Sequence, residues 1–102
     1  MSKKNYSIEE IRKIIQDILK NFDVKKAILF GSYAKNTPTS VSDIDLVIDS
    51  EGKLRNIYFY GLLEDLVNKL QKNIDLIEIS EIKKDSPLYN QIQKEGVVVY
   101  EK

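Results

Sequence analysis

Residues 30–47 read F-G-S-Y-A-K-N-T-P-T-S-V-S-D-I-D-L-V, and this stretch decides how the rest of the chain is interpreted. An apolar strand, 27–30, runs into a Gly-Ser turn, and a polar loop then leads to a second strand that opens with two aspartates. Gly31 directly after a strand lets the backbone turn tightly, so that the following amide groups can approach an anion. We expect Ser32 to lie at the N-terminus of a short helix, where the helix dipole favours phosphate.

Asp43 and Asp45 are separated by one residue at the start of the expected strand Ile44–Ile48. Successive side chains on a strand point to opposite faces, so the two carboxylates share a face. Oxygen ligands beside a phosphate-binding turn favour Mg²⁺ or Mn²⁺, which shares its coordination sphere with substrate phosphates. A lone D-x-D pair also occurs as two solvated acids at a strand entry. The preceding strand and Gly-Ser turn favour the metal–nucleotide interpretation.

The composition excludes several classes of function. The chain has 102 residues, of which 42% are hydrophobic, and we expect one domain over residues 1–102. Lysine plus arginine and aspartate plus glutamate number 16 each, so there is no overall basic field to hold long nucleic acid. Neither cysteine nor histidine is present, which leaves carboxylates, hydroxyls, lysines and hard cations for catalysis. No apolar run is long enough for a membrane span and no signal peptide is recognisable, so a cytoplasmic protein is expected.

The hydrophobic pattern predicts alternating helices and strands. A capping box at Ser7 and Glu10 opens a helix expected over Ile8–Phe22, and a second long helix is expected from Leu54 to Lys72. Ser86 and Pro87 are typical of the start of a third, shorter helix that stops at Gly96. The expected strands are Ala27–Phe30, Ile44–Ile48, Ile74–Ile79 and Val97–Tyr100. The pattern is that of an α/β (α+β) protein with a small mixed sheet and helices packed against it.

Two residues inside these elements have ambiguous roles. Gly61 lies in the middle of the second long helix, where glycine costs about 1 kcal/mol relative to alanine, so we expect it to mark a close approach by another segment. Tyr33 follows the Gly-Ser turn and either stacks on a nucleotide or packs in the core; packing is the interpretation that we prefer.

Gly31-Ser32, ten intervening residues and Asp43-Ile44-Asp45 resemble the G-S-x10-D-x-D signature of the nucleotidyltransferase superfamily that includes DNA polymerase beta. The short chain is similar to the minimal, MNT-type branch. The strand N-I-D-L-I-E-I at residues 73–79 and the C-terminal E-G-V-V-V-Y-E at residues 95–101 also look like segments of that branch. The resemblance therefore covers most of the chain and implies a nucleotidyltransferase fold.

The resemblance also implies roles for individual residues. Asp43, Asp45 and Asp75 would be the catalytic, metal-binding carboxylates, with the first two bridging two Mg²⁺ ions and Asp75 acting as the candidate base. Gly31, Ser32 and Lys35 would contact the triphosphate of ATP. Lys35 stands where the family often has arginine, and Asn36 where it often has glycine; lysine lacks the planar fork of arginine, which alters any phosphate contact.

MNT-type proteins are commonly antitoxins encoded beside a HEPN-domain toxin. The resemblance thus implies a hetero-oligomer with a HEPN ribonuclease and transfer of AMP from ATP to a tyrosine hydroxyl of that partner. Two alternatives remain. One is a catalytically silent antitoxin or binding module that neutralises its partner by contact, and the other is transfer to a small molecule such as an aminoglycoside, whose transferases carry a larger acceptor domain.

Overall fold

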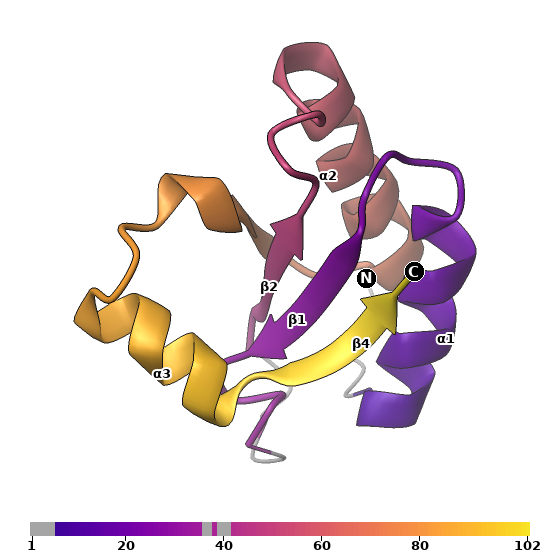
Figure 1. Cartoon of the computed structure of the whole chain (residues 1–102). Helices are drawn as coiled ribbons and strands as arrows, with labels where there is room; N and C mark the ends of the chain where they lie inside the picture. The colour runs from indigo at the N-terminus through magenta and orange to yellow at the C-terminus, as the bar shows by residue number, and fades with distance from the viewer. Residues whose placement is uncertain (1–5, 36–37, 39–41) are drawn as a thin grey trace.

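The computed structural model describes residues 6–35, 38 and 42–102, and these form a mixed four-stranded sheet with helices packed against it (Figure 1). The strand order is β3-β2-β1-β4; β1 pairs antiparallel with both β2 and β4, and β2 pairs parallel with β3. The fold class predicted from the sequence is therefore confirmed. The elements in chain order are α1 (Ile8–Leu19), β1 (Lys26–Phe30), β2 (Ile44–Asp49), α2 (Asn56–Leu70), β3 (Ile74–Glu78), the 3-10 turn η1 (Ile79–Glu81), α3 (Pro87–Glu95) and β4 (Val97–Glu101).

Helix α1 begins where the capping box predicts. It ends at Leu19, before the predicted end at Phe22. The amide of Glu10 donates to Ser7 Oγ at 3.1 Å, and the amide of Ser7 donates to Glu10 Oε1 at 2.9 Å. These bonds satisfy amides that would otherwise lack partners at the helix start. At the other end, Phe22 donates to Leu19 with a three-residue spacing, at 3.0 Å, so the chain tightens into a turn before Phe22.

One face of the sheet carries the main core. Figure 1 shows α1 and α2 next to each other, and their buried stripes pack on the inward side chains of the strands. Both helices use residues spaced by three or four positions, as amphipathic helices do. The helix residues buried there are Ile11, Ile15, Leu19, Leu62, Leu66 and Leu70, and the strand residues include Ala27, Leu29, Ile44, Leu46, Ile48 and Val99.

Helix α2 departs from the prediction at its N-terminal half. It begins at Asn56 instead of Leu54, and Ile57 and Tyr58, which belong to the apolar pattern, are 77% and 70% exposed. A Cβ placed on Gly61 would meet no atom within 4 Å. The expectation that Gly61 marks a close approach is therefore wrong, because open space surrounds that position.

The opposite face of the sheet is only partly covered. Ile92 of α3 packs with Ile28 and Val47 in a second, smaller cluster at the β1 side. Helix α3 starts as predicted, with the amide of Tyr89 donating to Ser86 Oγ at 3.2 Å. In Figure 1, α3 lies apart from α1 and α2, beside the ends of β1 and β4.

Two further expectations, the loop after Lys35 and the end of the third strand, are not confirmed. The loop predicted from Lys35 to Ser42, including Asn36, lies mostly outside the described residues. Strand β3 ends at Glu78, and Ile79 opens η1, so the predicted strand is one residue too long.

Within residues 6–35, 38 and 42–102, no helix has the length and apolar character needed to cross a membrane.

Candidate metal and nucleotide site

Asp45 and Asp75 stand side by side on adjacent strands. The parallel register of β2 and β3 pairs Asp45 directly with Asp75, and the antiparallel register of β1 and β2 pairs Asp45 with Phe30. Ile44 and Leu46 point into the main core, so strand alternation sends Asp45 to the other, partly covered face. Asp45 is half-buried and Asp75 is exposed, which leaves the pair reachable from solvent.

Gly31 follows Phe30 and brings the backbone against the carboxylate of Asp45. Its φ of +75° lies in the left-handed region that favours glycine. A Cβ at this position would overlap Asp45 Oδ2 and lie 3.2 Å from Asp45 Cγ. Glycine is therefore required at position 31 for two reasons: it adopts the left-handed turn, and it leaves the space that the Asp45 carboxylate fills.

The surroundings of Asp45 change the titration of its carboxyl group. The pKa of Asp45 is raised from 3.8 to about 6, chiefly because burial removes water from the carboxylate. A hydrogen bond with Asp75 and repulsion from Asp75 raise the pKa further, and repulsion from Asp43 adds a smaller effect. This concentration of negative charge is a site that a cation would stabilise.

The donor set fits a hard divalent cation. Asp43, Asp45 and Asp75 offer oxygen ligands, which suit Mg²⁺ or Mn²⁺. Within the described residues, however, no three acidic side chains already stand as a preformed metal site. The structure thus brings Asp45 and Asp75 together, while Asp43 lies exposed immediately before β2 and acts on Asp45 only through its charge.

The residues expected to contact phosphate lie in the turn after β1. Residues 31–35 form a hydrogen-bonded turn, with the amide of Lys35 donating to the carbonyl of Gly31 at 3.2 Å. Ser32 therefore lies in a single turn and not at the start of a regular helix. Lys35 Nζ is 3.6 Å from Glu95 Oε1 of α3, so its ammonium is engaged in an exposed ion pair.

Tyr33, in the same turn, belongs to the main core. Its side chain is 1% exposed, which confirms the packing interpretation. The ammonium of Lys72 lies 5.9 Å from the centre of its ring. The buried ring anchors the turn on the side of the sheet away from Asp45.

Sequence reasoning missed the apolar surroundings of the carboxylates. Asp45 and Asp75 line a hollow of about 530 Å³ together with Tyr60 of α2 and Leu88 of α3. Tyr60 is 67% exposed and Leu88 is 42% exposed. The sequence contained part of this information. Tyr60 falls outside the Leu62-Leu66-Leu70 stripe of α2, so its ring was not expected to be buried in the core.

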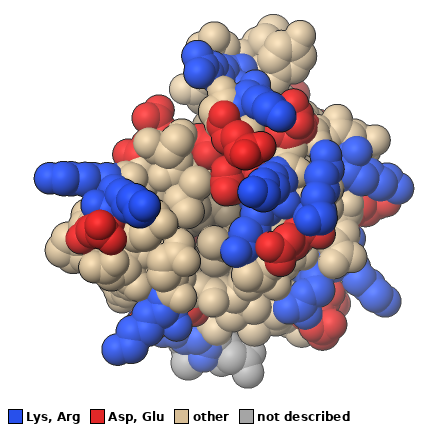
Figure 2. All heavy atoms as spheres, viewed as in Figure 1, with Lys and Arg blue, Asp and Glu red and all other residues tan. Residues whose placement is uncertain are grey.

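Charges elsewhere on the surface are mixed. Figure 2 shows acidic and basic side chains interspersed over the face in view. This agrees with the equal numbers of acidic and basic residues in the chain. Any attraction for phosphate would therefore have to come from local groups, because no broad basic surface is in view.

The sequence of residues 12–102 matches the family described as Polymerase beta, Nucleotidyltransferase. A candidate protein adenylyltransferase of Methanocaldococcus jannaschii is 36% identical over 77 residues, which are 74% of this chain and 82% of that protein. A second protein of the same name and organism is 35% identical over 69 residues, which are 68% of this chain and 70% of that protein.

Solved structures agree with the sequence comparison. A crystal structure of a toxin–antitoxin with AMP-PNP is similar with a TM-score of 0.76 and 25% identity over 89% of this chain and 73% of that chain. A structure of a tri-AMPylated Shewanella oneidensis HEPN toxin in complex with an MNT antitoxin gives 0.63 and 23% identity over 93% of this chain and 70% of that chain, which shows the shared fold. Because the family match extends over residues 12–102 and includes the turn at Gly31 and all three aspartates, this chain belongs to the polymerase beta nucleotidyltransferase family.

Proposed function

We propose that this protein transfers AMP from Mg²⁺-bound ATP to a hydroxyl of a partner protein, and that the partner is a HEPN-domain ribonuclease toxin. The observation that carries the proposal is the register of β2 and β3, which sets the Asp45 and Asp75 carboxylates side by side next to the Gly31 turn. Adjacent carboxylates beside a phosphate-binding turn are suited to phosphoryl chemistry supported by a divalent cation.

The relatives support ATP as the nucleotide and a HEPN-domain protein as the partner. The two Methanocaldococcus jannaschii proteins carry the name of protein adenylyltransferases. Among similar structures, one toxin–antitoxin contains AMP-PNP, and in another the HEPN toxin is tri-AMPylated. These findings concern those proteins, and they make ATP and a HEPN-domain protein the first substrates to test with this chain.

The proposed binding roles follow from the position of each group. Asp45 and Asp75 would hold Mg²⁺, and Asp43 would join them from the exposed end of β2. Bound there, the ions would neutralise the phosphates and lower the pKa of the acceptor hydroxyl. The turn at residues 31–35 offers backbone amides and the Ser32 hydroxyl to the triphosphate. For Lys35 to contact phosphate it must leave Glu95, which costs little because the two side chains are 55% and 36% exposed and water weakens their attraction.

Asp75 is suited to receive the proton of the acceptor. It is exposed at the rim of the hollow, whereas Asp45 is half-buried between its neighbours. The hydroxyl oxygen of the acceptor forms a bond to the α-phosphorus of ATP, its proton passes to the Asp75 carboxylate, and the bond to the departing pyrophosphate breaks with its electron pair on that leaving group. The products are the AMP-modified partner and pyrophosphate.

The test uses a HEPN-domain toxin as the acceptor, with one encoded next to the gene of this chain as the first choice. Incubation with Mg²⁺ and ATP should add the mass of AMP to that protein, and Asp45→Asn or Asp75→Asn should abolish the addition. Asp49→Asn is the matched control, because Asp49 lies on the same strand and the same face but pairs with Lys26 at the far end of β2. Absence of the mass shift, or an equal shift with Asp45→Asn, contradicts the proposal.

A contact-only antitoxin is the second candidate, and the exposed apolar residues of α2 favour it. Ile57, Tyr58 and Tyr60 present three large, mostly exposed side chains to solvent. Such residues are typical of protein interfaces. The two functions separate in cells that express the toxin: protection by Asp45→Asn supports neutralisation by contact, and loss of protection supports AMP transfer.

A further inference from the structure

Strand β3 forms an open edge of the sheet next to the proposed catalytic base. In the described part of the chain, β3 has β2 on one side and no strand on the other. The amide of Ile44 donates to the carbonyl of Asn73 at 3.0 Å, so the backbone of Asn73 faces β2. Backbone groups alternate in direction along a strand, and the amide and carbonyl of Leu76 therefore face away from β2. Such an edge is a template for a further strand.

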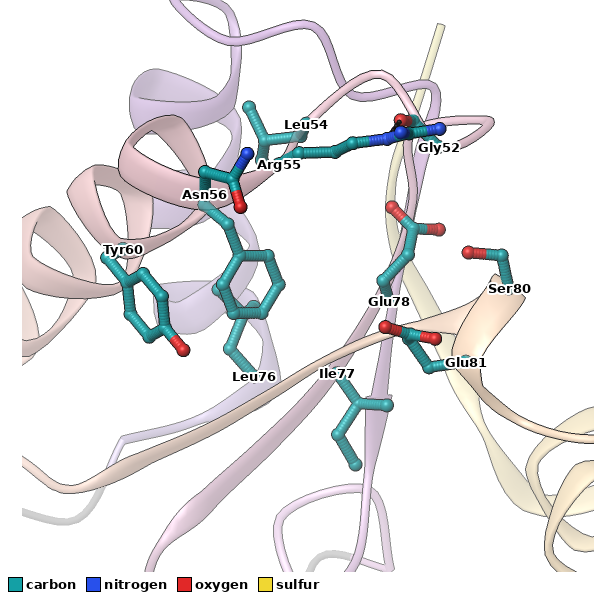
Figure 3. A pocket seen from close by; sticks show the side chains of 11 residues that line it. Gly52, Leu54, Arg55, Asn56, Tyr60, Leu76, Ile77, Glu78, Ser80 and Glu81 are labelled. Atoms are coloured by element: carbon teal, nitrogen blue, oxygen red, sulfur yellow. Dashed lines mark hydrogen bonds between the residues drawn. The ribbon is translucent and has the colours of Figure 1, made fainter.

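The open edge is hollowed on both sides. The hollow of about 530 Å³ that contains Asp75 lies on one side, and a second hollow of about 560 Å³ lies on the other. Both include Leu76 and Ile77 of β3 and reach Tyr60 of α2, so the two hollows adjoin along the strand, and we call them together the groove. Figure 3 shows the second hollow, with Tyr60 on one side and Glu78, Ser80 and Glu81 on the other. An extended chain has room to lie against β3.

The charges lining the groove favour a basic occupant. The charges of Asp45 and Asp75 in the first hollow would be neutralised by the proposed Mg²⁺, and the second hollow contributes Glu78 and Glu81 against a single lining cation, Arg55. Arg55 Nε already donates to the carbonyl of Gly52 at 2.6 Å, and Glu78 is buried. Glu81, by contrast, is exposed at η1 and is placed to meet a positive side chain (Figure 3).

We propose that the acceptor docks as an extended, basic segment that adds a strand to the free edge of β3 and places its hydroxyl residue opposite Asp75. This docking mode rests on the proposed AMP transfer and specifies its substrate class. Neighbouring strands lie about 4.8 Å apart, and residues opposite each other point to the same face. A tyrosine, serine or threonine opposite Asp75 therefore presents its hydroxyl to that carboxylate. The residues before and after this hydroxyl residue face the second hollow, which contains Glu81.

A peptide with these properties tests the docking mode directly. The probe is the synthetic peptide Lys-Val-Lys-Tyr-Lys-Val-Lys, in which tyrosine and valines share one face and the lysines share the other. With Mg²⁺ and a non-hydrolysable ATP analogue, it should slow hydrogen exchange of the Leu76 amide by about tenfold or more, as pairing of an open amide does. The Ile77 amide, which faces β2, is the internal reference and should change little.

Two control peptides and one variant define the specificity. The peptide with glutamate in place of lysine, and the lysine peptide with methylated backbone nitrogens, should leave exchange of the Leu76 amide unchanged. Glu81→Lys should weaken protection by the lysine peptide and permit protection by the glutamate peptide, with the thermal midpoint of the free variant as a check on folding. Unchanged exchange at millimolar lysine peptide, or equal protection by the methylated peptide, overturns the docking mode.

The same samples with ATP in place of the analogue separate the two proposals. Protection of Leu76 together with AMP on the tyrosine supports both. Protection without AMP transfer contradicts the proposed function and leaves the edge as a docking site. Transfer without protection of Leu76 supports the function and overturns docking at β3.

Discussion

Replacing Gly31 with alanine tests the link between the turn and the carboxylates, and Gly52 provides a matched control. Both glycines have left-handed backbones, with φ of +75° and +76°. At Gly31 the new methyl group would overlap Asp45 Oδ2, whereas at Gly52 its nearest neighbour is Arg55 Nη2 at 3.6 Å. The two substitutions therefore share backbone strain and differ in whether they displace Asp45.

The expected magnitudes follow from this difference. A left-handed alanine costs about 1 to 2 kcal/mol, so each variant should lose about 4 to 8 °C or more of thermal midpoint. The carboxylate of Asp45 can rotate away from the new methyl group, which limits the extra cost in folding but moves an oxygen away from Asp75. Displacement of a reacting or binding group by about 1 Å can cost roughly a hundredfold. At an ATP concentration of 100 times the wild-type dissociation constant, stabilisation by Mg-ATP would fall from about 2.7 to about 0.4 kcal/mol.

The assay is thermal unfolding of both variants and the wild type, with and without Mg-ATP. Gly52→Ala should keep the full stabilisation by Mg-ATP, and Gly31→Ala should lose most of it. If Gly31→Ala responds to Mg-ATP as the wild type does, the Asp45 carboxylate does not depend on the space at Gly31. If Gly52→Ala loses the response equally, strain in the fold and not displacement of Asp45 is the cause.

Three other substitutions have defined outcomes. The folded pKa of Asp45 is about 6 against 3.8 for the ordinary carboxyl, so the folded state holds an extra proton between these values and wild-type stability falls as pH rises through them. Asp45→Asn should therefore stabilise the metal-free protein at pH 7.5, with a gain that fades below about pH 4, in urea titrations over this range; a gain that grew towards acid pH would contradict the assignment. Gly61→Ala, in open space on α2, should raise the free energy of unfolding by about 1 kcal/mol without changing stabilisation by Mg-ATP, and a loss of stability would show a hidden contact. Glu95→Gln should release Lys35 and tighten ATP binding by about two- to fivefold in calorimetry, with little change in stability, whereas weaker binding would exclude Lys35 from phosphate contact.

The local parts of this structure could be predicted from the sequence. Capping at Ser7 and at Ser86 is decided by neighbouring residues, and both helices start there. The Gly-Ser turn and the alternation around Asp45 are equally local, and the structure places Gly31 against that carboxylate. Short-range chemistry thus accounts for most element boundaries and for half of the site.

The remainder depends on contacts between distant segments. The pairing of Asp45 with Asp75 is set by the parallel register of two strands that α2 separates in sequence, and no local pattern encodes it. Helical spacing places Ile57 in an apolar pattern but does not say which element covers it, and none of the described elements does. The ion pair of Lys35 with Glu95 likewise depends on where α3 packs.

The position of β4 has a consequence for synthesis of the protein. Strand β4 pairs with β1, which follows the first helix, so an early and a late segment of the chain are neighbours at one edge of the sheet. Until β4 emerges from the ribosome, β1 lacks one neighbour and the backbone that leads into Gly31 is unsupported on that side. Long-range pairings of this kind form late in folding. A growing chain should therefore complete the sheet beside Gly31 and Asp45 only after β4 has emerged from the ribosome.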